Sequence, residues 1–173
     1  MAASLPPDEL ARLRPALRAI GTIADPDIAL ENADLKALLT YWNSKRAGRE
    51  MPTRDDIDPL DLGYVLANIL MVDVQHQPLR FRWRLIGTEI TAVLGRDRTG
   101  RWFDEVYEGA TLDGFNAALE LSVRTRRPMR FVGDGDFAQR DYLAYESIQL
   151  PLSDDGELVN IVMIAAKYGS RAP

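Results

Sequence analysis

The chain has 173 residues, of which 46% are hydrophobic, and its formal net charge at pH 7 is −5. This length suits one domain with an extension, and the negative balance argues against a nucleic-acid-binding protein, which is normally basic. The absence of cysteine excludes disulfides, cysteine nucleophiles, iron–sulfur clusters and thiolate metal sites. Neither a signal peptide nor an apolar run of the about 18 to 20 residues needed to span a membrane is present, so a cytoplasmic location is expected.

Residues 1–31 form an expected N-terminal helical extension with one apolar stripe, made of Leu10, Leu13, Leu17 and Ile20. Such a stripe must be buried, either by its own domain or by a second copy of the chain. The four residues are therefore candidates for a dimer interface. Pro15 predicts a break or kink near Arg14, because proline lacks the amide hydrogen that a helix interior uses.

A domain over residues 32–168 is expected to follow, with residues 169–173 as a short tail. Its first helix is predicted to start at Asn32 or Asp34. The acidic residues that come next could be mistaken for a metal or catalytic cluster. Thr53 with Asp56, and Asp58 before a proline, are better explained as helix caps.

Residues 80–86 alternate strictly, with Phe81, Trp83 and Leu85 on one face and arginines on the other. This period of two predicts a half-buried strand, which forms a hairpin with an apolar strand over residues 68–74. The only histidine, His76, lies in the connecting loop, where we expect it to be solvated. Gly87 ends the second strand, and Thr88 is predicted to cap a short helix that stops at Gly95.

A long helix is predicted from a cap at Thr111 to about Arg126, followed by strands over residues 128–132, 142–150 and 158–167. The last strand is the most apolar in the chain, so we expect it to be central, buried on both faces and paired beside the first strand. The predicted fold class is α+β, with a five-stranded antiparallel sheet and a helical cap on one face.

This order of elements resembles the PAS fold, and several motifs resemble those of short bacterial proteins made of a single PAS domain. The resemblance covers about residues 33–167. Its residues are Tyr41-Trp42, Pro52-Thr53, Asp58-Pro59, the run from Phe81 to Thr88 with Arg84, Gly95, Asp97, Thr99-Gly100-Arg101, Arg127-Pro128, Leu150-Pro151-Leu152-Ser153 and Gly156. It implies a sensor or interaction module and brings no catalytic residues with it.

The resemblance implies a ligand pocket between the sheet and the helical cap. Candidate lining residues are Trp83, Leu85, Leu94, Phe103, Phe115, Leu119, Phe131 and Tyr145. Glu146, if it faces inward, needs a partner, for which Arg84 and the tyrosines are candidates, and such a polar pair could orient a ligand. The alternative is that the apolar members are simply core.

No cofactor and no metal site are predicted. Covalent attachment of a flavin would need a cysteine, which the chain lacks, and the loop position of His76 argues against haem binding. Noncovalent flavin binding is an alternative that the sequence leaves open.

The leading hypothesis is a homodimeric sensor that signals by contact with a separate protein, because too few residues follow Lys167 for an output domain. A ligand-free structural adaptor is the alternative, and a small isomerase-like enzyme using Glu146 with Tyr142 or Tyr145 is a third possibility. An arginine cluster could bind an anion or pair locally; its members are Arg96, Arg98, Arg101, Arg124, Arg126 and Arg127. Membranes and nucleic acids are not expected partners.

Overall fold

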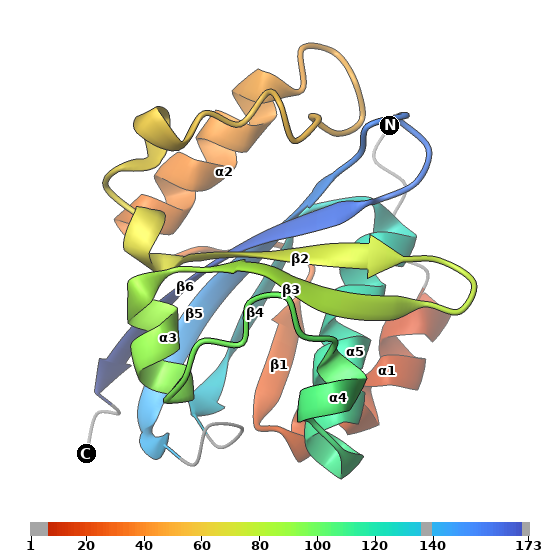
Figure 1. Ribbon diagram of the computed structural model, residues 1–173, viewed down its shortest axis with the longest axis vertical. Coiled ribbons are helices and arrows are strands. Elements are labelled where there is room, and N and C mark those ends of the chain that lie inside the picture. The colour runs from red at the N-terminus through yellow and green to blue at the C-terminus, as the bar shows by residue number, and fades with distance from the viewer. Residues whose placement is uncertain (1–6, 136–139, 171–173) are drawn as a thin grey trace.

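The computed structural model describes residues 7–135 and 140–170 (Figure 1). Within them, a six-stranded antiparallel sheet has the strand order β1-β4-β5-β6-β2-β3. The strands are β1 (Thr22–Asp25), β2 (Ile69–Gln75), β3 (Arg80–Ile86), β4 (Met129–Gly135), β5 (Arg140–Leu152) and β6 (Ile161–Ser170). The helices are α1 (Pro7–Ala19), α2 (Ala33–Lys45), α3 (Thr88–Leu94), α4 (Phe103–Val106) and α5 (Gly109–Thr125), with short 3-10 turns η1 (Pro59–Leu62) and η2 (Leu66–Asn68).

The α+β fold and the position of the last strand are confirmed. β6 lies between β5 and β2, and its residues 161–166 are all buried. The apolar run therefore marks a strand with both faces covered. The hairpin β2–β3 is also confirmed, and its register runs from Leu70 opposite Ile86 to Gln75 opposite Arg80.

The expected number of strands is wrong, because β1 adds a sixth strand at the edge beside β4. β1 is only four residues long, and its alternation consists of a buried Thr22 followed by an exposed Ile23. So short an edge strand leaves almost no periodic signal in the sequence. Gly133 allows the chain to approach here, because a Cβ at this position would collide with the carbonyl oxygen of Gly21.

Helices cover both faces of the sheet, whereas the sequence predicted a cap on one face. In Figure 1, α2 lies on one side of the sheet, while α3, α4 and α5 lie on the other. The indole nitrogen of Trp42 in α2 donates to the carbonyl of Pro151 in β5 at 3.0 Å. At the other end of the helix, Lys167 of β6 pairs with Asp34 at 2.7 Å. A single amphipathic helix does not reveal from its sequence which face of a sheet it covers.

The predicted break at Pro15 is wrong, because α1 runs through it from Pro7 to Ala19. Pro15 is exposed, so the ring and the missing hydrogen bond lie on the solvent side of the helix. Leu13 and Leu17 flank it and are buried against α5, in a cluster with Leu121 and Phe131. This packing offsets the cost of a proline in a helix interior, which is about 3 kcal/mol.

Three predicted caps are confirmed and two are wrong. Thr53 and Asp56 form the expected capping box, in which each side chain accepts from the backbone amide of the other, at 2.7 and 3.3 Å. The side chain of Asn32 accepts hydrogen bonds from the backbone at the start of α2, and Asp58 caps η1 in the same way. The residue before α3 is Gly87 and the residue before α5 is Glu108, in place of Thr88 and Thr111. Both threonines lie inside their helices.

Candidate functional site

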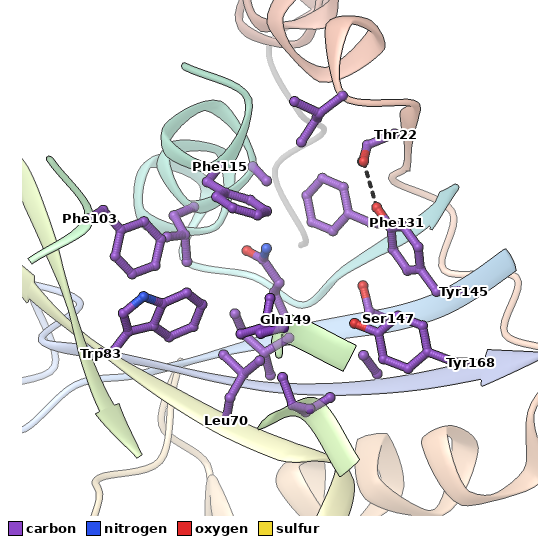
Figure 2. A pocket seen from close by; sticks show the side chains of 17 residues that line it. Thr22, Leu70, Trp83, Phe103, Phe115, Phe131, Tyr145, Ser147, Gln149 and Tyr168 are labelled. Carbon is purple, nitrogen blue, oxygen red and sulfur yellow. Dashed lines mark hydrogen bonds between the residues drawn. The ribbon is translucent and has the colours of Figure 1, made fainter. Parts of the chain in front are cut away.

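A cavity of about 100 Å³ lies between the sheet and the helices α3, α4 and α5, and it is partly open to solvent (Figure 2). Seven of the ten predicted pocket residues line it, namely Trp83, Leu94, Phe103, Phe115, Leu119, Phe131 and Tyr145. They come from strands and helices that are far apart in the sequence, and the fold brings them together on one side of the sheet.

Leu85 does not reach the cavity, and this corrects the prediction made from the alternating pattern. In the hairpin, Val72 pairs with Trp83 but the preceding Met71 pairs with Leu85, so Arg84 is an extra residue in β3. Such a bulge shifts the alternation by one position. Leu85 therefore turns to the opposite face, where it is 40% exposed.

Arg84 and Glu146 do not form the predicted polar pair and do not line the cavity. Arg84 donates to Asp73 at 3.0 Å on the surface. Glu146 alternates with Tyr145 and Ser147 along β5, so it points to the face of the sheet that α2 covers. The carboxylate required by the isomerase-like hypothesis thus lies outside the cavity, and the side chain of Tyr142 lies outside the described residues.

Glu146 instead belongs to an ion-pair network that anchors the N-terminal extension. One carboxylate oxygen accepts from the guanidinium of Arg130 at 2.7 Å, and Arg130 also donates to Asp25 of β1 at 3.0 Å. The two oxygens of Glu146 further accept from the backbone amides of Glu31 and Asn32, each at 2.8 Å. The network therefore joins β1, β4, β5 and the start of α2.

This network predicts a dependence of stability on pH. Burial raises the pKa of Glu146, but hydrogen bonds from the amides of Glu31 and Asn32 and from Arg130 outweigh it, and the net shift is downward. A carboxyl group whose pKa is lower in the folded state stabilises the protein above its unfolded pKa of about 4.3. That contribution is lost as the pH falls through the folded pKa.

We expect the free energy of unfolding to fall less between pH 5 and pH 3 for Glu146→Gln than for the unmodified protein, because the amide does not titrate. Urea unfolding at a series of pH values measures this difference. Two parallel stability curves would contradict the role assigned to the carboxylate.

The polar groups that line the cavity lie on strands β1, β5 and β6 and form its polar wall. Thr22 of β1 and Tyr145 share a hydrogen bond of 2.5 Å between their hydroxyl groups. Gln149 accepts from the hydroxyl of Ser122 in α5 at 2.6 Å, which holds its amide beside the cavity. Ser147 and Tyr168 complete this wall (Figure 2). Ser147 and Gln149 could have been found from the sequence, since they alternate with Tyr145, whereas Thr22 belongs to the strand that gave no signal.

The other wall is largely aromatic, and on it the indole nitrogen of Trp83 is buried without a hydrogen-bond partner in the part of the chain that the structure describes. The rings of Trp83 and Phe103 stack with centroids 4.4 Å apart, and Phe115 meets Phe103 edge to face at 6.1 Å. Such arrangements are favoured by the charge distribution of aromatic rings. Leu70, Ile90 and Leu119 fill the space around them.

The remaining candidate residues have local partners. His76 bonds to the carbonyl of Val159 at 2.9 Å. The arginine cluster is dispersed into separate contacts, for example Arg101 with Glu105 and Arg124 with Glu120. Among residues 7–135 and 140–170, no group of histidine, cysteine and acidic side chains has the geometry to hold a metal ion.

Larger hollows also occur. One, of about 570 Å³, separates the segment around η1 and η2 from the hairpin β2–β3, and another, of about 760 Å³, lies over Arg130 and Glu146; both are more open than the cavity. A third, of about 220 Å³, lies between α1 and β1 and is lined partly by arginine side chains. The cavity beneath the helices, which is lined mostly by apolar and aromatic side chains, is the better candidate for binding a small molecule.

An antiparallel sheet with helices on its faces and a small, mostly apolar cavity beneath them defines an α+β fold. The chain belongs to the PAS domain family, whose model matches residues 30–164. No significant match is found among curated proteins or among solved structures. Helices of the described part of the chain are all too short or too polar to cross a membrane.

Proposed function

We propose that the protein is a cytoplasmic, non-catalytic sensory module that binds a small molecule between its sheet and helices and passes the signal on by contact with another protein. Membership of the PAS family supports a sensory or interaction role. The observation that carries the ligand-binding part is the cavity itself, because it combines an aromatic wall with a few convergent polar groups. An ordinary core would have filled this space.

The cavity can be closed without changing its polar wall. Ala118 of α5 lines it and is 8% exposed. We expect Ala118→Leu to fill much of the space and to remove small-molecule binding while the fold persists, since the added methyl groups enter existing room. Native mass spectrometry of the freshly purified variant measures the bound mass, and circular dichroism checks the fold.

Ala110→Leu is the matched control, because Ala110 is exposed on the same helix. A bound molecule that survives Ala118→Leu would show that the cavity is not its site. A bound molecule lost from both variants would equally contradict the assignment.

We also propose that the protein is a homodimer, with a contact surface other than the N-terminal stripe expected from the sequence. Leu13, Leu17 and Ile20 of the N-terminal stripe are buried inside their own chain, and Leu10 packs against the same cluster. A dimer would therefore use other surfaces.

A further inference from the structure

The walls of the cavity restrict the charge of its ligand. No acidic, basic or histidine side chain occurs among the described residues that line it. Arg130, Glu146 and Lys167 of the same strands face the other side of the sheet and pair with each other or with Asp25 and Asp34. Asp134 of β4 lies near Tyr145 but does not line the cavity. A charged ligand would lose its hydration without gaining a counter-ion, which is costly. The chemistry of the walls therefore favours a neutral molecule.

The polar wall restricts where the ligand carries its polar atom. Burial raises the pKa of Tyr145 to about 12, and burial also raises the pKa of Tyr168. Both phenols are therefore protonated at neutral pH. The hydroxyl of Tyr145 already shares a hydrogen bond with Thr22, so the hydroxyl of Tyr168 is the donor offered to a ligand. Ser147 lies beside them on the same wall (Figure 2). A ligand with an oxygen at this end would find donors, whereas its other end would meet mainly aromatic and aliphatic side chains together with the buried indole nitrogen of Trp83.

The size and shape of the cavity restrict the size and shape of the ligand. The space of about 100 Å³ is of the same order as an engineered cavity of about 150 Å³ that binds benzene. Trp83, Phe103 and Phe115 present ring faces and edges to it. One flat ring matches this wall, while a long acyl chain or a polycyclic cofactor exceeds the room.

We propose that the cavity binds a neutral molecule with a single aromatic ring and one oxygen-bearing polar group. The ring lies beside Trp83, Phe103 and Phe115, and the oxygen accepts a hydrogen bond from the wall of Ser147 and Tyr168. The inference rests on the proposed function, because it names the ligand class of that same cavity.

The test compares three probes by isothermal titration calorimetry on the full chain. Benzamide and benzoate have nearly the same shape but differ in charge, and toluene keeps the ring without the polar group. We expect benzamide to bind at least tenfold more tightly than either of the others. Tyr168→Phe, which removes one hydroxyl and keeps the ring, is expected to weaken benzamide several-fold and to leave toluene unchanged.

Benzoate or toluene binding as tightly as benzamide would overturn the inference, and so would the absence of binding by all three probes. Such results for the ligand class can be distinguished from failure of the proposed function. If a small molecule leaves the native protein on denaturation and is lost in Ala118→Leu, the cavity is still a binding site and only its ligand class is wrong. If no such molecule is found either, both proposals fail.

Discussion

Replacing Arg130 with methionine is expected to lower the free energy of unfolding by about 3–5 kcal/mol. The guanidinium is 12% exposed and lies between Asp25 and Glu146, whose side chains are 19% and 13% exposed. Methionine keeps much of the volume but leaves two poorly hydrated carboxylates without a cation. Urea unfolding at pH 7 measures the loss.

Two further variants sharpen this prediction. Arg82→Met removes a guanidinium that pairs with Asp73 at 2.8 Å but is 44% exposed, and such surface pairs contribute about 0–1 kcal/mol. Adding Glu146→Gln to Arg130→Met should restore part of the stability, because the unpaired charge is gone. A loss in Arg130→Met no larger than that in Arg82→Met would show that the network does not anchor the extension.

The second large effect is expected at the N-terminal helix. Leu17 is 1% exposed and packs against α5, so Leu17→Ala should cost about 2–5 kcal/mol through lost burial and the cavity that remains. Arg14→Ala, on the exposed face of the same helix, should change stability by less than about 0.5 kcal/mol. Thermal or urea unfolding of the two variants measures their losses in stability.

Deleting the N-terminal extension distinguishes a structural role of this helix from a role in dimerisation. If the stripe of Leu10, Leu13, Leu17 and Ile20 were a dimer interface, as the sequence suggested, deleting residues 1–31 would shift the protein toward monomer. Because the deletion also removes β1 and Asp25, we now expect it to yield an unfolded or aggregating chain. A folded, monomeric deletion variant would mean that α1 and β1 are dispensable for the domain.

Much of the fold followed from the sequence where periodic patterns were long. The apolar run of β6 predicted its central position, and the alternation of β3 predicted the hairpin. The aromatic residues of the cavity followed from the resemblance to PAS proteins combined with these strands. Local pattern and overall fold agree at these places, as expected of a natural sequence.

The misses have identifiable physical causes. One extra residue at Arg84 reverses the faces of β3, and nothing in the local sequence announces a bulge, so Leu85 was placed in the cavity. Glu146 was placed there because a lone acid between apolar neighbours suggested a functional site. Its actual partners are Arg130 and two backbone amides from the segment between β1 and α2, which only the tertiary structure brings near.

Native mass spectrometry of the freshly purified full chain, followed by denaturation of the same sample, tests the central claim most directly. The account predicts that the native protein carries the extra mass of a small molecule, that this mass leaves on denaturation, and that Ala118→Leu lacks it while Ala110→Leu retains it. A native protein with the mass of the polypeptide alone, identical in all three forms, would contradict the claim that the cavity is a ligand site.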